Sequence, residues 1–453
     1  MGMFSLSLDD TIAGISAPTG GAISIVRISG PDAVAILKKI FKTNIKTFES
    51  HKIYYGWVVD GNNQPVDEVL ASVMLAPKTF TTQDVVEINC HGGSLVTQKI
   101  LELVLEAGAR LAEGGEFTKR AFLAGRIDLS RAEAVMDIIS AKSNLAHKAA
   151  ASQLSGRLGA SLEACRENLL NLAARIEMAI DYPEHEEADI LGDEVKFAIL
   201  EVSTQIDNLL TTARQGKFIR EGIKTAIIGS PNAGKSSLLN ALLDEERAIV
   251  THIPGTTRDV LKETIKIGDI FLTISDTAGI RETEDLVESE GVARSLKEAA
   301  EADLVLLVVD GTLPQPLEAP LIDENWKNVI VVVNKMDLPQ NLDKAAFEGF
   351  SVVEISAKNA DGLENLTTKI TEMFVSKNME YFQEMVTNIR HINLLNEAKR
   401  ALCAAANSAE MGMCVDLTAI DIAAALAALG EITGAVVDEE LIEKIFSEFC
   451  LGK

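Results

Sequence analysis

Hydrophobic and polar positions follow four successive patterns along the chain. Between residues 11 and 120 short β-type runs alternate with turns and two helical segments, which predicts an α+β domain. Between residues 117 and 213 apolar residues recur three and four positions apart, which predicts helices. From Thr225 continuous apolar runs alternate with helical patterns, as expected for parallel strands buried on both faces. After about Met373 alanine-rich helical patterns return.

These patterns predict particular strands and helices. The expected strands are 22–28, 53–59, 69–75, 85–89, 225–228, 270–274, 304–309 and 329–333. The expected helices include 32–40, 95–107, 238–242, 393–409, 416–429 and 438–449.

The order of the patterns indicates how the domains are arranged. At about 150 residues per domain, a chain of 453 residues has about three domains. Because helical stretches lie on both sides of the α/β stretch, we expect one helical domain with an α/β domain inserted between its halves. The expected boundaries are 1–120 for the N-terminal domain, 121–218 and 377–453 for the two parts of the helical domain, and 219–376 for the inserted domain.

Composition excludes several classes of protein. The formal net charge is −25, so the chain as a whole does not attract DNA, RNA or an anionic membrane, and any such contact is local. A local basic patch at Lys119, Arg120, Arg126 and Arg131 is one hypothesis. No apolar run reaches the ~20 residues of a membrane span, and the N-terminus lacks the pattern of a secretion signal.

The cysteines favour a reducing compartment. Five cysteines are an odd number with no CxxC pair, which argues against a disulfide framework or a zinc site and predicts a cytoplasmic protein. Cys450, near the carboxyl end, is either a reactive thiol whose thiolate is favoured by Lys453 or a small apolar anchor for the tail. The others are expected to be packing residues: Cys90, Cys165, Cys403 and Cys414.

A phosphate-binding loop is expected at Gly229–Ser236. The segment GSPNAGKS matches GxxxxGK(S/T), follows an apolar strand and precedes a helix. Its glycines let backbone N–H groups surround phosphates at a helix N-terminus. Lys235 would then contact the β and γ oxygens, and the hydroxyl of Ser236 would ligate Mg²⁺.

Three further motifs follow in the order of a GTP-binding domain. Asp276-Thr277-Ala278-Gly279 fits the DxxG switch, in which the aspartate holds Mg²⁺ through water. In Asn334-Lys335-Met336-Asp337 the final aspartate can accept the ring N–H and the exocyclic amine of guanine, which selects GTP over ATP. Ser356-Ala357-Lys358 is the loop that supports the guanine carbonyl. The fold class expected is therefore a multidomain chain whose inserted domain is an α/β P-loop GTPase of the Ras-like type.

Two departures from the Ras-type plan bear on catalysis. Ile280 stands where Ras-type enzymes place the glutamine that orients the attacking water, so another residue must do so. Acidic residues between 282 and 288 are candidates, and their spacing does not choose among them. Thr257 is assigned to Mg²⁺, while the missing positive charge would come from a monovalent cation near Asn232, which is favoured, or from Arg258 as an arginine finger.

Motifs along the whole chain resemble those of the bacterial tRNA modification GTPase family MnmE, also called TrmE. They are Val26–Gly30, Gly92-Gly93 after His91, Gly115–Leu123, Asp128–Ala134, Gly255–Asp259 and Phe449–Lys453. The resemblance implies an N-terminal domain that binds tetrahydrofolate and forms a homodimer, a helical domain and an inserted GTPase domain. It also implies a flavin-binding partner, MnmG, with which the protein modifies C5 of the wobble uridine in certain tRNAs. A carboxymethylaminomethyl or aminomethyl group would be built with a folate one-carbon unit.

The resemblance also assigns roles to individual residues. GTP hydrolysis would be stimulated by K⁺, whose ligands would be Asn232, Thr251, the carbonyl of Ile253, and Thr256. The protein ligands of Mg²⁺ would be Ser236 and Thr257, and Glu288 would orient the attacking water. Contacts to a 5-formyl- or 5,10-methylene-tetrahydrofolate would come from Arg27, Glu87, Arg126 and Lys453. Arg126 departs from the family, in which lysine is common at this position.

The residues expected around GTP and its ions form one set. They are Asn232, Ala233, Gly234, Lys235, Ser236, Ser237, Thr251, His252, Ile253, Pro254, Gly255, Thr256, Thr257, Asp276, Thr277, Ala278, Gly279, Asn334, Lys335, Asp337, Ser356, Ala357 and Lys358. The residues expected to act in catalysis are Glu288, Lys235, Arg258 and Cys450.

Two other classes of GTPase fit the sequence less well. A ribosome-assembly GTPase that acts as an RNA-binding switch would carry a basic RNA-binding domain, whereas the C-terminal region here is alanine-rich and acidic. A membrane-remodelling GTPase would need a basic amphipathic surface helix, and no such segment is found in the sequence.

Overall fold

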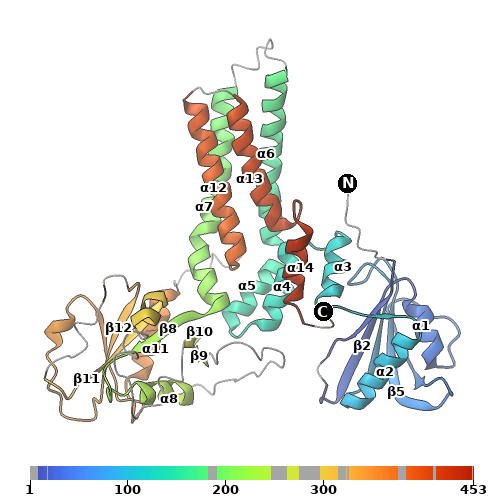
Figure 1. Ribbon diagram of the computed structural model, residues 1–453, viewed down its shortest axis with the longest axis horizontal. Helices are drawn as coiled ribbons and strands as arrows, with labels where there is room; N and C mark the ends of the chain where they lie inside the picture. Colours follow the sequence, from blue (N-terminus) through green and yellow to red (C-terminus); the bar gives the residue numbers. More distant parts are fainter. Residues whose placement is uncertain are drawn as a thin grey trace. The chain divides into compact units, whose positions relative to one another are not determined.

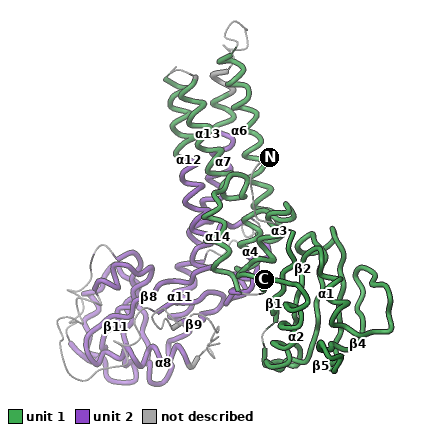
Figure 2. Tube along the Cα trace, turned by 45° about the vertical axis from the view of Figure 1, so that its right-hand side comes forward, with its two compact units in different colours: residues 1–136, 153–199, 400–453 green, residues 137–152, 200–399 purple. Residues whose placement is uncertain are grey.

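The computed structural model describes most of the chain and divides it into two compact units (Figure 2). The described residues are 9–17, 19–181, 191–245, 263–274, 296–314, 323, 326–375, 384–411, 415–450 and 452. Unit 1 comprises residues 1–136, 153–199 and 400–453, and unit 2 comprises residues 137–152 and 200–399. The units are described separately.

A seven-stranded sheet forms the N-terminal part of unit 1, in the order β3-β4-β5-β6-β2-β1-β7 (Figure 1). Its strands are β1 (Ile12–Ile15), β2 (Ile23–Ser29), β3 (Phe41–Lys42), β4 (Lys52–Val59), β5 (Pro65–Met74), β6 (Val85–His91) and β7 (Arg110–Leu111). Neighbouring strands are antiparallel except for β1 and β7, which run parallel.

Alternating side chains of this sheet form a core with two helices. Helices α1 (Ala33–Ile40) and α2 (Ser94–Glu106) bury their apolar faces against it. Val86, Ile88 and Cys90 of β6 point into this core, whereas the residues between them are less buried. The period of two along the strand therefore leaves the opposite face of the sheet free to carry functional side chains.

Helices make up the rest of unit 1. They are α3 (Glu116–Leu123), the first part of α4 (Leu129–Ser140), α6 (Arg157–Asp181), the start of α7 (Leu191–Glu221), the end of α12 (Ile389–Glu410), α13 (Val415–Thr433) and α14 (Glu439–Ser447). Helix α6 packs along α13 (Figures 1 and 2). Its buried residues Leu162, Leu169, Leu172 and Ile176 follow the three-to-four spacing from which the helix was predicted.

Unit 2 contains a second, six-stranded sheet in the order β13-β12-β11-β8-β10-β9. Its strands are β8 (Ile223–Ile228), β9 (Glu263–Ile267), β10 (Ile270–Ile274), β11 (Leu304–Asp310), β12 (Val329–Asn334) and β13 (Ser351–Glu354). All pairs are parallel except β9 with β10. Strands β8, β11 and β12 contribute to a core cluster on each face, as their continuous apolar runs predicted.

Helices α8 (Lys235–Glu245) and α11 (Leu363–Phe374) contribute to one of these clusters. Most of α5 (Asn144–Leu154), the greater part of α7 and the first half of α12 also belong to unit 2. Because α7 ends at Glu221 and β8 begins at Ile223, the chain enters the second sheet directly from a long helix.

The structure confirms the predicted combination of an α+β part, a helical part and an inserted α/β domain, while the exact domain boundaries stay a prediction. Among the described helices, none combines the length and the apolar character that a bilayer span requires. One expectation is wrong: Cys403 is exposed, although Cys90 and Cys165 are buried as expected. Cys403 lies on the outward face of α12, and Cys414 lies outside the described residues.

Candidate functional site

The phosphate-binding loop predicted at Gly229–Ser236 connects β8 to α8, as its sequence context required. Gly229 has φ +152°, and a Cβ there would lie 2.2 Å from the carbonyl oxygen of Val308. Gly234 has φ +99°, and a Cβ there would lie 2.1 Å from Nδ2 of Asn334. Only glycine fits both positions, so the loop can bring its backbone N–H groups close to a ligand at the start of α8.

Lys235 is the first residue of α8, and its ammonium group lies over the loop. Its Nζ donates to the carbonyl oxygens of Gly229 at 2.7 Å and Ser230 at 2.9 Å. Ser236 is half-buried in the first turn of the same helix. A cation and a hydroxyl thus stand together at a helix N-terminus, where the free N–H groups and the helix dipole favour a phosphate.

Asn334 joins three of the predicted motifs. Its Nδ2 donates to the carbonyl oxygen of Ala233 at 2.9 Å, and its Oδ1 accepts a hydrogen bond from the backbone N–H of Ala357 at 3.0 Å. The side chain is buried, with 3% of the residue exposed. Asn334 therefore fixes the phosphate-binding loop relative to the two loops at the ends of β12 and β13.

Asp337 lies at the same edge of the sheet and is exposed. Its Oδ1 accepts a hydrogen bond of 2.7 Å from the hydroxyl of Ser356. This bond lowers the pKa of Asp337 from its ordinary value, so the group is a carboxylate at neutral pH. An exposed, oriented carboxylate can accept two N–H groups of a planar ligand such as guanine.

Asn232 has a left-handed backbone conformation, with φ +64°. Asparagine tolerates this conformation better than most residues. Asn232 is exposed in the loop, between the strand that precedes it and the helix that follows.

Ser237 is exposed in α8 and Lys358 is exposed in the loop after β13, whereas the remaining predicted residues of the nucleotide site lie outside the described residues. They are Thr251, His252, Ile253, Pro254, Gly255, Thr256, Thr257, Arg258, Asp276, Thr277, Ala278, Gly279 and Glu288. The described part of the site therefore contains the phosphate-binding loop and the base-binding loops.

A second group of predicted residues lies on the seven-stranded sheet of unit 1. Arg27 of β2 and Glu87 of β6 face each other in register, and Nε of Arg27 donates to Oε1 of Glu87 at 2.8 Å. The guanidinium also lies over the ring of Phe117, 5.5 Å from its centroid. Both members of the pair are partly exposed. The expectation that these two residues act together is consistent with this geometry.

The carboxyl-terminal tail reaches the same place. The carbonyl oxygen of Gly452 accepts from Oγ of Ser16 at 3.0 Å and from Nη1 of Arg27 at 3.4 Å. Gly452 has φ +84°, and a Cβ there would lie 2.0 Å from the carbonyl oxygen of Ile15. Sequence reasoning missed Ser16, Phe117 and Gly452, although a glycine next to the terminal lysine is a signal of close backbone approach. Lys453 lies outside the described residues.

Arg126 is exposed, and its guanidinium contacts a loop between β5 and β6. Nη1 donates to the carbonyl oxygen of Phe80 at 3.2 Å, and the guanidinium carbon lies 5.0 Å from the centroid of the Phe80 ring. Cys450 is exposed, and its carbonyl oxygen accepts from the N–H of Gly115 at 3.4 Å. The structure therefore leaves both alternatives for Cys450 open.

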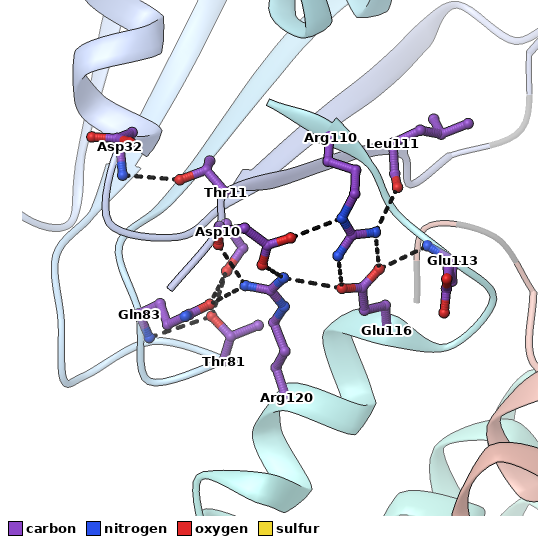
Figure 3. Close-up of polar contacts among 11 residues, drawn as sticks. Asp10, Thr11, Asp32, Thr81, Gln83, Arg110, Leu111, Glu113, Glu116 and Arg120 are labelled. Carbon is purple, nitrogen blue, oxygen red and sulfur yellow. Dashed lines mark hydrogen bonds and ion pairs between the residues drawn. The ribbon is translucent and has the colours of Figure 1, made fainter. Parts of the chain in front are cut away.

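The hypothesis of a basic patch is wrong for two of its four members. Lys119 and Arg120 are buried rather than exposed. Figure 3 shows why for Arg120: its guanidinium donates to Asp10 at 2.5 Å and to Glu116 at 3.0 Å. Arg110 donates to the same two carboxylates. Charged residues are usually solvated, but here the buried Arg120 and Glu116 form ion pairs with each other and with the more exposed Asp10 and Arg110.

Comparisons with known proteins cover the whole chain. The family described as "GTP-binding protein TrmE N-terminus" matches residues 11–126, and the family described as "MnmE helical domain" matches residues 129–450. Proteins named tRNA modification GTPase MnmE from Lactiplantibacillus plantarum and Enterococcus faecalis are each 49% identical to the chain. The one from Lactococcus lactis subsp. cremoris is 50% identical, and each alignment covers 98% of both chains.

Solved structures match a smaller share of the chain. The G domain of the T. maritima FeoB iron transporter is 28% identical, and the match covers 33% of this chain and 97% of that one, with a TM-score of 0.23.

Proposed function

The chain belongs to the MnmE family of tRNA modification GTPases and is a GTP hydrolase of tRNA modification; from this premise we propose how its residues carry out that work. GTP binds at the end of β8 and drives changes that gate a modification of C5 of the wobble uridine. The observation that carries this proposal is the bridge made by Asn334, which joins the phosphate-binding loop to the loops of Asp337 and Ser356.

The phosphates are held by the loop backbone and by Lys235. The ammonium of Lys235 exchanges the carbonyl oxygens of Gly229 and Ser230 for phosphate oxygens, because an anion is a stronger acceptor than a carbonyl. The hydroxyl of Ser236 fits Mg²⁺, a hard cation that prefers oxygen ligands, and Thr257 would be its second protein ligand. Bound Mg²⁺ supplies charge neutralisation at the phosphates.

The base is read by Asp337. Its carboxylate, oriented by Ser356, accepts the ring N–H and the exocyclic amine of guanine, while the N–H of Ala357 lies in the loop that supports the guanine carbonyl. Adenine offers neither of these donors in that arrangement. The same groups therefore give affinity for GTP and discrimination against ATP.

The attacking water is oriented by Glu288, since Ile280 cannot align water. A potassium ion supplies the positive charge that an arginine finger supplies in other GTPases. Its ligands would be Asn232, Thr251, the carbonyl of Ile253, and Thr256. The left-handed backbone of Asn232 supports this role, because such a conformation persists where a functional position requires it.

A tetrahydrofolate derivative binds on the sheet of unit 1, where Arg27 and Glu87 form a partly exposed pair. A carboxylate can accept the N–H groups of a pterin, and a guanidinium stacked on Phe117 can hold a ring or a carboxylate of the folate. The carbonyl of Gly452 accepts a hydrogen bond from Arg27 of this pair, and Lys453, the next residue of the sequence, would be a further contact to the folate. Arg126 would contribute a further contact, and the bound folate supplies the one-carbon unit.

Two features support the proposed partners. On the exposed face of the sheet, Ile53, Tyr55 and Trp57 of β4 and Leu70 of β5 are between 42% and 66% exposed, and Tyr55 faces Leu70 in register. An apolar sheet face of this kind is suited to a second copy of the chain. The net charge of −25 favours a partner of the MnmG type as the main carrier of positive surface for tRNA.

The proposal is tested in cells whose own copy of the gene is deleted and replaced by a variant. Mass spectrometry of tRNA nucleosides should show the modified wobble uridine with the wild-type gene and its absence with Lys235→Ala. Lys224→Ala, which changes an exposed lysine of β8, is the matched control and should behave as wild type. Normal modification with Lys235→Ala would refute the dependence of the reaction on GTP.

A further inference from the structure

Gln340 contacts the loop that carries Asp337. Its Nε2 donates to the carbonyl oxygens of Lys335, at 2.9 Å, and of Leu338, at 2.7 Å. The N–H of Leu338 also donates to the carbonyl of Lys335, at 3.0 Å. One side-chain amide therefore holds the carbonyls on both sides of Asp337.

The backbone that Gln340 holds is strained. Lys335 has φ +66°, a conformation that a residue with a Cβ adopts rarely and keeps only where its surroundings enforce it. Its side chain is held as well, since Nζ lies 2.6 Å from Oδ2 of Asp310. Gln340 and Asp310 thus fix the main chain and the side chain of the same residue, two positions before Asp337.

Asp310 is itself held in place at the end of β11, where it faces Asn334 in register. Its Oδ1 accepts from the backbone N–H of Thr312 at 3.0 Å and from its hydroxyl at 2.7 Å. Burial alone would raise the pKa of Asp310, but the hydrogen bonds from Lys335 and Thr312 outweigh it and lower the pKa. The carboxylate is therefore charged at neutral pH and can hold the ammonium of Lys335.

The space for Gln340 depends on Gly311. A Cβ at Gly311 would lie 2.0 Å from Oε1 of Gln340. That oxygen is buried and, within the described part of the chain, has no hydrogen-bond partner. The carbonyl of Gly311 accepts from the N–H of Asn341 at 3.0 Å, which joins the loop after β11 to the loop after β12. The side chain of Gln340 is therefore held in one position by close packing against Gly311 and by the two hydrogen bonds that it donates.

We propose that Gln340 is a positioning residue for guanine recognition, which it supports by holding the turn at Lys335 so that the carboxylate of Asp337 meets the exocyclic amine of the base. Gln340 does not touch the nucleotide in this scheme. This inference rests on the proposed role of Asp337 in binding guanine. It adds the residue that fixes the position of the Asp337 carboxylate. Asp310 acts in the same way through the side chain of Lys335.

The test compares GTP with ITP, whose base lacks the exocyclic amine. Dissociation constants are measured for the wild-type protein and for Gln340→Glu, which keeps the shape of the side chain but places an oxygen against two carbonyl oxygens. We expect GTP to bind about tenfold more weakly to the variant, whereas ITP, which offers Asp337 only the ring N–H, should lose affinity by a clearly smaller factor. Asn365→Asp adds the same charge on the exposed face of α11 and should leave both constants unchanged.

The outcomes separate this inference from the proposed function. The role of Gln340 alone would be overturned if Gln340→Glu still preferred GTP over ITP as strongly as the wild type does. It would also be overturned if the variant lost the same factor in affinity for both nucleotides. Wild-type protein that binds GTP and ITP equally would overturn the role of Asp337 and this inference together. Should Gln340→Glu bind neither nucleotide because it does not fold, Asp310→Asn takes its place, with the same selective loss expected and the same results overturning it.

Discussion

The guanidinium of Arg27 donates to the carboxylate of Glu87 at 2.8 Å, from directly opposite positions on β2 and β6. Cross-strand pairs of opposite charge are common. In this pair, however, the guanidinium of Arg27 also donates a hydrogen bond to the carbonyl of Gly452 and lies over the ring of Phe117. Two segments that are 425 positions apart thus meet at one guanidinium. Such a convergence is expected of a binding site rather than of a solvated sheet surface.

Removing this pair should weaken folate binding. In a titration with 5-formyltetrahydrofolate, the double variant Arg27→Ala, Glu87→Ala should bind at least about tenfold more weakly than the wild type, because a charge-assisted hydrogen bond to the ligand is worth about 1.5 to 3 kcal/mol. Lys42→Ala, an exposed charge on the edge strand β3, should bind as the wild type does. Wild-type binding no tighter than that of the double variant would remove the folate site.

Gly452→Ala should release the tail. A Cβ at this position would approach the carbonyl of Ile15 within 2.0 Å, and the left-handed φ is unfavourable for alanine. We expect carboxypeptidase to remove the tail faster from this variant than from the wild type, and folate to bind more weakly. Gly61→Ala is the control, since a Cβ there meets open space. Equal digestion rates for Gly452→Ala and the wild type would show that the tail is not held.

The cluster in Figure 3 should make the N-terminal part of unit 1 sensitive to acid. Burial would raise the pKa of Glu116 and of Asp10, but hydrogen bonds from Arg110 and Arg120 lower both. A carboxyl whose pKa is lowered by folding stabilises the fold above its unfolded pKa of about 4, and this stabilisation is lost as the pH falls below that value. The hydrogen-exchange protection of α3, corrected for the intrinsic pH dependence of amide exchange, should therefore fall below about pH 4 and stay constant between pH 6 and 8.

Glu116→Gln tests the same cluster at neutral pH. It leaves the buried Arg120 with less compensating charge, which typically costs about 3 to 5 kcal/mol. Faster hydrogen exchange of α3 is the expected result. Glu113→Gln changes an exposed carboxyl in the loop before α3 and should exchange as the wild type does. Unchanged exchange in Glu116→Gln would mean that the cluster does not support the fold.

Local motifs could be predicted from the sequence, whereas long-range partners could not. The phosphate-binding loop was predicted because its chemistry lies within eight consecutive residues next to a strand and a helix. The hydrogen bond from Asn334 to Ala233 could not be predicted, because the two residues are 101 positions apart in the sequence. The family resemblance names Arg27 and Glu87 as folate contacts, but nothing in the sequence predicts the ion pair between these two residues, which are 60 positions apart.

Buried charge was the main source of error. The sequence predicts a local basic patch at Lys119, Arg120, Arg126 and Arg131, because charged residues are usually solvated. Arg120 is instead buried, since Asp10 and Glu116 neutralise it. The helical period gives the direction of a side chain relative to its own helix, but not the identity of a partner from another part of the chain.

Glu288→Ala should separate binding from hydrolysis. Because the proposed role of Glu288 is to orient the attacking water rather than to hold the nucleotide, we expect near-normal GTP affinity and a loss of turnover of about 10² or more. Glu284→Ala, another carboxyl of the same segment, is the control and should turn over as the wild type does. Unchanged turnover in Glu288→Ala would mean that a different residue orients the attacking water.

The central claim is that the loop beginning at Gly229 hydrolyses GTP efficiently only when a bound potassium ion completes it. The most direct test measures GTP turnover in KCl and in NaCl at equal ionic strength, for the wild type and for Asn232→Ala. The account predicts a clearly higher wild-type rate in KCl and the loss of this difference in the variant. Equal wild-type rates in the two salts would contradict it.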